Sequence, residues 1–148
     1  MPSAVRLGLL VVSLFTLAQA PAAVISAVPE FRVVVNAANP LQSVQRTLLR
    51  DLFLKRETRW PDGAAALPVD LIPRARARRS FDEQILGRSV AAVRNAWEQS
   101  IFSGRDVPPP ELATDAEVLR YVASHRGAVG YVARDTVLPP TVHAVKVQ

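Results

Sequence analysis

The sequence contains no cysteine, only two histidines and one methionine among its 148 residues. Without cysteine it can form no disulfide, offers no thiolate to a substrate or a metal ion, and has no residue that could carry a lipid after an export signal. His125 and His143 lie apart from each other, with no nucleophilic serine motif nearby. Each histidine is therefore explained better as a structural residue than as a catalytic one.

The loops that hold nucleotides or metal ions are also missing. Gly127 and Gly130 lack the full spacing of a dinucleotide-binding loop, and no P-loop or Asp-rich calcium loop occurs. Asp82 and Glu83 are adjacent, so on a helix their carboxylates point apart and cannot work as an acid–base pair. We therefore expect no enzymatic activity, no cofactor and no metal ion.

Only the N-terminus carries a long hydrophobic run. Arg6 precedes the apolar residues 7–17, and small residues follow as in a secretory signal. The run is shorter than the ~20 residues of a spanning helix, which favours a cleaved signal over an uncleaved membrane anchor. The predicted signal is residues 1–22, with cleavage after Ala20 or Ala22.

The remaining residues 23–148 have the length of one ordinary domain. We expect a periplasmic or secreted protein that is soluble, is not a lipoprotein and has no stable membrane span once the signal is removed. Losing Arg6 lowers the formal charge from +5 to +4, and nearly all of the positive charge is arginine. Arginine suits oxyanions through paired hydrogen bonds, whereas export argues against nucleic acid as a partner.

Strand-like and helix-like segments alternate along residues 31–147. Strands are expected at 31–36, 67–72, 127–133 and 142–147, the last one at a sheet edge. Helices are expected with N-caps at Ser43, Ser80, Ser89 and Thr114, ending near Lys55, Gly87, Gly104 and Gly127. The alternation predicts an α/β fold with a mixed sheet.

Four arginines within six residues are the strongest binding candidate. Arg74, Arg76, Arg78 and Arg79 follow a predicted strand and precede Ser80, a predicted helix start. Helix N-termini attract anions, and α/β sheets bind ligands beyond the carboxyl ends of their strands. The alternative is a solvated loop whose arginines pair with surface carboxylates.

The two tryptophans have structural explanations as well. Trp97 belongs to the expected apolar stripe of its helix, with Val90, Val93, Ala96 and Ile101. Trp60 precedes the turn Pro61-Asp62-Gly63, where it is expected to cover the end of the first helix rather than stack on a ligand.

Several of these stretches resemble phosphate-binding-protein-like domains, the substrate-binding proteins of phosphate ABC transporters. FLKRETRWPDG, residues 53–63, is similar to a family segment that reads Phe-Leu-Gly-Lys, three residues, Trp, and a turn with Asp and Gly. GAVGYVA, residues 127–133, resembles the family's Gly-Ala/Ser-Ile-Gly-Tyr-Val strand. ILGRS, the tryptophan helix and IFSGRDVPP also fit, so the resemblance spans about residues 31–133.

The resemblance implies one lobe of the type 2 periplasmic-binding-protein architecture, a mixed sheet flanked by helices. Full-length members close two lobes on phosphate, and this chain is similar to the second lobe. It departs from the family where an arginine precedes Ser-Gly-Thr, because here the sequence reads PRARARRSF. Lys55 also replaces the family's glycine.

Two hypotheses follow from the sequence. In the first, the protein binds phosphate or a similar oxyanion weakly through Arg74, Arg76, Arg78, Arg79 and Ser80, with a transporter or another periplasmic protein as its partner. In the second, the lobe has lost its ligand and acts as an interaction domain, through a protein partner or through self-association.

Overall fold

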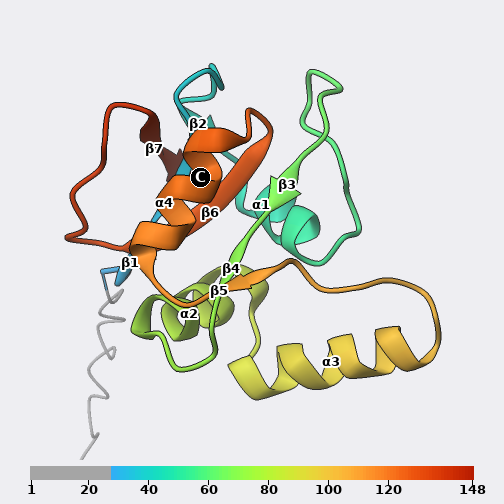
Figure 1. Cartoon of the computed structure of the whole chain (residues 1–148). Coiled ribbons are helices and arrows are strands. Elements are labelled where there is room, and N and C mark those ends of the chain that lie inside the picture. Colours follow the sequence, from blue (N-terminus) through green and yellow to red (C-terminus); the bar gives the residue numbers. More distant parts are fainter. Residues whose placement is uncertain (1–27) are drawn as a thin grey trace, which may run out of the picture.

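The computed structural model describes residues 28–148 (Figure 1). The predicted signal peptide and its cleavage position lie outside the described residues. Among residues 28–148 no helix combines the length and the apolar character needed to cross a membrane.

The main sheet has five strands in the order β2-β7-β1-β6-β3. The strands are β1 (Phe31–Asn36), β2 (Ser43–Val44), β3 (Leu67–Pro68), β6 (Ala128–Ala133) and β7 (Val142–Val147). β1 runs antiparallel to both of its neighbours, whereas β2 is parallel to β7 and β3 is parallel to β6. A second small parallel sheet pairs β4 (Asp70–Leu71) with β5 (Glu111–Leu112). The predicted mixed sheet is thus confirmed.

Five helical segments are described, and the first two and the last cover the two faces of this sheet. They are α1 (Arg46–Phe53), α2 (Arg76–Phe81), the π-helix η1 (Asp82–Leu86), α3 (Val90–Phe102) and α4 (Asp115–Ser124). α4 lies across one face, where the Asn36 side chain donates to the carbonyls of Val122 and Ala123. α1 and α2 lie against the other face. Strand and helix types therefore follow the predicted α/β pattern.

An aromatic cluster holds α1 and α2 on the sheet. The ring of Phe81 on α2 stacks on Tyr131 of β6 with centroids 4.0 Å apart. Phe53 on α1 and Phe31 on β1 pack against Phe81 at 4.6 and 5.4 Å. All four side chains are buried, so this cluster forms the centre of the core on that face.

The two glycines of the GAVGYVA segment allow close packing, Gly130 against α4 and Gly127 against the backbone of Ala65. A Cβ atom at Gly130 would lie 2.7 Å from a methyl group of Val118 on α4 and 2.9 Å from one of Val69. A Cβ at Gly127 would lie 2.1 Å from the carbonyl oxygen of Ala65. These distances are too short for any side chain, so the motif has a packing function here.

Trp60 is a structural residue, as the sequence predicts, whereas its cover of the first helix end stays a prediction. Its side chain is buried, and its indole N–H donates to the carbonyl of Gly127 at 2.9 Å. The turn after it closes through the Gly63 amide, which donates to the carbonyl of Trp60. The tryptophan thus ties this turn to the start of β6.

Several predicted boundaries are confirmed. Ser89 caps α3 by accepting from the Ala92 amide, and Thr114 and Glu117 form the expected capping box of α4. η1 ends at Gly87 in the left-handed conformation, and Gly104 is left-handed just after α3. α4 ends at Ser124, three residues before the expected end near Gly127.

Other predictions are wrong. Ser43 lies in β2 and the N-cap of α1 is Gln45, which makes no side-chain cap. Ser80 lies inside α2 instead of starting a helix, because extended backbone at Ala75 lets the helix begin at Arg76. β7 is not the outermost strand of the sheet, since β2 pairs with its last two residues, Lys146 and Val147. The predicted strand 67–72 is divided between two sheets.

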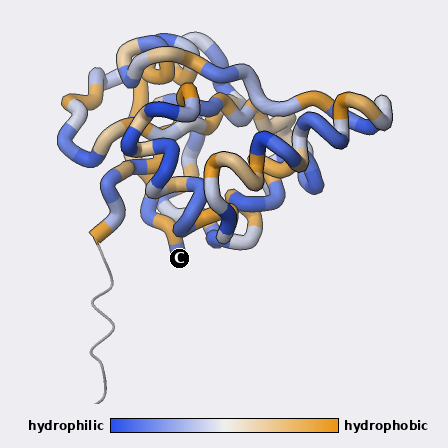
Figure 2. Tube along the Cα trace, turned by 90° about the horizontal axis from the view of Figure 1, so that it is seen from below, coloured by the Kyte–Doolittle hydropathy of each residue, from blue (hydrophilic) through white to orange (hydrophobic). Residues whose placement is uncertain are grey.

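α3 is the least integrated helix. Val93 is its only buried residue, and Trp97 is only partly buried against the core, contrary to the expected core position. Ile101 is 50% exposed and Phe102 is 91% exposed. The end of α3 and the loop after it project on the right of Figures 1 and 2, where hydrophobic as well as hydrophilic residues reach the outside.

Candidate functional site

The structure divides the five predicted site residues between the surface and the interior. Arg74 and Arg76 are exposed at the start of α2, and Arg79 is exposed one turn later. Arg78 and Ser80 are buried. The five side chains therefore do not form a single ligand shell, and each needs its own description.

Ser80 holds the N-terminal segment against α2. Its Oγ accepts from the backbone N–H of Glu30 at 3.3 Å and from the side-chain amide of Gln84 at 2.9 Å. The hydroxyl oxygen of Ser80 thus accepts two hydrogen bonds from other parts of the protein. Its position still matters for binding, since it places Glu30 beside the exposed arginines.

Arg78 is the centre of a buried charge network. Its Nε donates to Oδ2 of Asp82 at 2.8 Å, and its Nη1 donates to the carbonyl of Leu71 at 2.6 Å. Nη1 also lies 3.0 Å from Oδ2 of Asp70 and 3.1 Å from Oε1 of Glu111. This arginine joins α2 to both strands of the small sheet, a structural role that the sequence did not indicate.

The network holds three carboxylates and one guanidinium. Burial raises the pKa of Asp70 to about 7, although the charge of Arg78 and the hydroxyl of Tyr131, which donates to Asp70, act in the opposite direction. Burial also raises the pKa of Asp82, against the stabilising hydrogen bond and charge of Arg78. The pKa of Tyr131 lies well above its usual value because of burial and of the charge on Asp70.

Burial lowers the pKa of Arg78, but the negative charge of Asp70 and its other partners outweighs burial, so the net shift is upward. The guanidinium therefore stays charged, and the carboxylates share one positive partner. Oδ1 of Asp82 is buried and has no hydrogen-bond partner among residues 28–148. A carboxyl group in such a site holds its proton more tightly than one in water.

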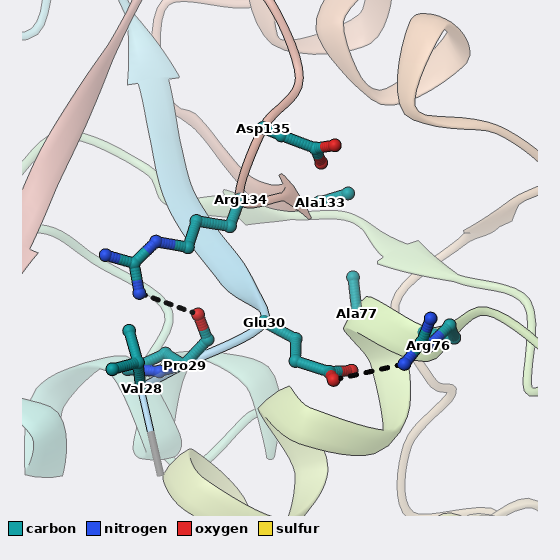
Figure 3. A pocket seen from close by; sticks show the side chains of 8 residues that line it. All are labelled: Val28, Pro29, Glu30, Arg76, Ala77, Ala133, Arg134 and Asp135. Carbon is teal, nitrogen blue, oxygen red and sulfur yellow. Dashed lines mark hydrogen bonds and ion pairs between the residues drawn. The ribbon is translucent and has the colours of Figure 1, made fainter.

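The exposed Arg76 borders a surface hollow at the carboxyl end of β6 and the start of β1 (Figure 3). The hollow has a volume of about 420 Å³ and is lined by Val28, Pro29, Glu30, Arg76, Ala77, Ala133, Arg134 and Asp135. We call it the Arg76 hollow. Glu30 and Arg76 point toward each other at 3.3 Å, and Arg134 donates to the carbonyl of Pro29.

Two neighbouring hollows add further arginines. One adjoins the Arg76 hollow through Glu30 and Arg76, and includes Arg79 and Glu83. The other adjoins it through Pro29 and Arg134, and includes Arg32. Together with the Arg76 hollow they form a shallow surface that also carries the carboxylates Glu30, Glu83 and Asp135. An anion there competes with Glu30 for the guanidinium of Arg76.

Arg134 and Glu30 belong to this surface but were not predicted from the sequence. Arg134 directly follows the GAVGYVA strand, so the rule that ligands bind beyond strand carboxyl ends could have indicated it. Glu30 has no comparable signal, because its proximity to Arg76 depends on the fold. Among the residues that the structure describes, no group of three or more His, Asp or Glu side chains could hold a metal ion.

No protein-family model and no curated protein sequence matches the chain. Solved structures do match it, at low sequence identity. A protein described as a phosphate ABC transporter substrate-binding protein, with bound phosphate, from Clostridium perfringens is 19% identical with a TM-score of 0.62, over 80% of this chain and 44% of that one.

Two other structures give the same result. An ABC-type phosphate transport receptor from Vibrio cholerae is 18% identical with a TM-score of 0.62, over 80% of this chain and 46% of its own. The PstS protein of Borrelia burgdorferi is 8% identical with a TM-score of 0.61, over 80% of this chain and 47% of its own. The chain thus spans less than half the length of each, and its fold is similar to one part of each of these structures, as the sequence motifs predicted.

Proposed function

We propose that this protein is a non-enzymatic binding domain that holds phosphate or a similar oxyanion weakly at the Arg76 hollow. The observation that carries the proposal is the position of Arg76. Its side chain is 84% exposed, stands on the first residue of α2, and borders a hollow at the carboxyl end of β6. Ligands of α/β proteins bind at such strand ends, and solved proteins with this fold are named as phosphate-binding.

The proposed site is a revision of the set read from the sequence. Arg76, Arg79 and Arg134 supply accessible guanidinium groups, whereas Arg78 and Ser80 maintain the structure beneath them. Arg74 is exposed just before α2 and can add to the positive field. Guanidinium groups suit a tetrahedral oxyanion because they donate paired hydrogen bonds.

Weak affinity follows from the charges already present. Glu30 is paired with Arg76, and Asp135 lines the same hollow, so an incoming anion displaces one carboxylate and is repelled by another. The hollow is also open to solvent, where salt screens charge contacts. We expect phosphate to bind in the millimolar range, about −4 kcal/mol.

The experiment is a calorimetric titration of the purified protein with phosphate at low ionic strength, using Arg76→Gln and Glu30→Gln variants. Arg76→Gln should weaken binding and Glu30→Gln should strengthen it, because the second change frees the guanidinium. Arg120→Gln removes an exposed arginine on α4 and serves as the control. Equal affinities in all four proteins would refute this site.

Export and a transporter partner belong to the same proposal. They are supported by the signal-like N-terminus and by the names of the structural relatives, which are transport receptors and substrate-binding proteins. N-terminal sequencing of the protein recovered from an exporting host tests the first part. A start at Pro21 or Ala23 is expected, and an intact Met1 in the recovered protein would contradict it.

An interaction domain is the second candidate. It is favoured by the exposed apolar residues around the end of α3, where Phe102 is 91% and Val107 is 59% exposed. Sedimentation of the protein with and without a Phe102→Ser change tests self-association. A dimer that this change dissociates would support the second candidate, and a monomer at every concentration would contradict self-association.

A further inference from the structure

A second cavity lies between α3 and the small β4–β5 sheet, and it shares no lining residue with the Arg76 hollow. Its volume is about 170 Å³. Trp97, Ile101 and Pro108 supply its apolar wall, and five charged side chains supply the rest: Asp70, Arg78, Arg94, Glu98 and Glu111. We call it the Trp97 cavity.

Two opposite charges on α3 line this cavity without pairing. Arg94 and Glu98 are one helical turn apart, a spacing at which such side chains commonly form an ion pair. Neither side chain has an ion-pair or hydrogen-bond partner among residues 28–148 at the usual contact distances. The wall of the cavity thus presents one positive and one negative group, both available to a ligand.

The buried side of the cavity also presents one positive and one negative group, Arg78 and Glu111. Arg78 is 1% exposed and lines the cavity, and its bonds to protein groups run through Nε and Nη1. Within the described part of the chain, no acceptor is found for its Nη2. The side chain of Glu111 beside it is 39% exposed, so one of its carboxylate faces remains accessible.

We propose that the Trp97 cavity binds a small zwitterion that carries a carboxylate, an ammonium group and an apolar side chain, the chemistry of a free apolar amino acid. Its carboxylate accepts from Arg94 and from Nη2 of Arg78. Its ammonium group donates to Glu98 and Glu111. Its side chain packs on the half-buried indole of Trp97 and on Ile101.

A ligand with one charge matches the cavity less well. A simple anion leaves Glu98 and Glu111 facing it, and a simple cation leaves Arg94 without a partner. A ligand that enters the cavity displaces water from both Arg94 and Glu98. Each of these two charges therefore needs an opposite charge on the ligand. This requirement makes the zwitterion distinguishable from its two singly charged analogues by experiment.

The test titrates the purified full chain with L-valine, L-leucine and L-phenylalanine at neutral pH, following tryptophan fluorescence and the thermal midpoint. The charge controls are 4-methylpentanoate, which is leucine without its ammonium group, and 3-methylbutylamine, which is leucine without its carboxylate. We expect a saturable response to at least one amino acid. Both analogues should bind at least about tenfold more weakly than leucine.

Matched variants locate the site. Arg94→Gln and Glu98→Gln should each weaken binding about fivefold or more, whereas Arg105→Gln, an exposed arginine outside the cavity, should leave it unchanged. All three positions are exposed, so the folded state should survive each change. The Arg76→Gln variant should bind the amino acid normally, which separates this site from the proposed phosphate site.

Three outcomes overturn the proposal. The first is the absence of a saturable response to any of the three amino acids up to about 10 mM. The second is a response to a singly charged analogue that is as strong as the response to leucine. The third is amino-acid binding that is unchanged in both Arg94→Gln and Glu98→Gln. Each is readable by fluorescence in the intact protein, with the buried Trp60 contributing a constant background.

Discussion

Nε of Arg78 donates to Oδ2 of Asp82 at 2.8 Å, and both side chains are almost completely buried where α2 passes into η1. The pair spans one helical turn, and the same short helix carries the exposed Arg76 and Arg79. An arginine that the sequence placed in a ligand site is therefore a structural residue. The exposed arginines remain available to solvent and to an anion.

Arg78→Met should be strongly destabilising. The change keeps a long side chain but leaves Asp70, Asp82 and Glu111 without their shared positive partner. Removing one partner of a buried ion pair lowers the free energy of unfolding by about 3–5 kcal/mol. Urea unfolding measures the loss, with Arg79→Met, at an exposed neighbouring position, expected to change it by less than about 0.5 kcal/mol. Equal losses in the two variants would contradict the buried network.

Stability should fall as the pH rises from weakly acidic to weakly alkaline. The pKa of Asp70 is raised from 3.8 to about 7 in the folded protein, chiefly by burial, so the folded state binds this proton more tightly than the unfolded chain. The stabilisation is complete below pH 3.8 and is lost as the pH rises through 7. Asp82 acts in the same direction.

Urea unfolding at about pH 5 and about pH 8 measures this dependence. The wild-type protein should be more stable at the lower pH by on the order of a few kcal/mol. Asp70→Asn cannot ionise, so its difference between the two conditions should be clearly smaller. A wild-type protein that gains stability between these two pH values would show that Asp70 is ionised throughout.

Gly130→Ala should be destabilising although alanine suits a strand better. The added methyl group would meet Val118 and Val69 at less than 3 Å, so α4 or β6 has to shift. Overpacking of this kind costs about 1–3 kcal/mol. Ala144→Val, at an exposed position of β7, adds volume where nothing is crowded and serves as the control. A Gly130→Ala protein as stable as wild type would disprove the close approach of α4.

The two tryptophans should differ in their response to replacement by phenylalanine. Trp60→Phe loses the hydrogen bond to Gly127 and leaves a void in the core, which should cost about 1–3 kcal/mol. Trp97→Phe changes a half-buried side chain and should cost less than about 1 kcal/mol. Thermal unfolding of both variants decides the order, and the reverse order would place Trp97 in the core after all.

Local signals explain which parts of the fold were predictable. β1 and the capping box of α4 were correct because each depends on neighbouring residues, a β-branched run in one case and Thr114 with Glu117 in the other. Ser80 and Glu83 satisfy the same capping pattern, yet α2 had already begun at Arg76. The pattern alone cannot distinguish a helix start from a helix interior.

Distant contacts explain what the sequence could not show. Arg78 is buried because Asp70 on β4 and Glu111 on β5 bind it, and Glu111 reaches it only because β5 pairs with β4 in the fold. β7 is covered by the two-residue strand β2, which is too short for any periodicity. The apolar stripe of α3 predicts a buried face, but Val93 is the only residue of this helix that is fully buried.

Oxyanion binding at Arg76 is the proposal on which the function rests. A calorimetric titration of the protein with phosphate at low salt, with sulfate as the control, measures this binding. We predict saturable heat from phosphate that exceeds the heat from sulfate, weakens in Arg76→Gln and strengthens in Glu30→Gln. No heat from either anion, in the wild-type protein and in Glu30→Gln alike, would contradict the binding function and leave the interaction domain as the remaining candidate.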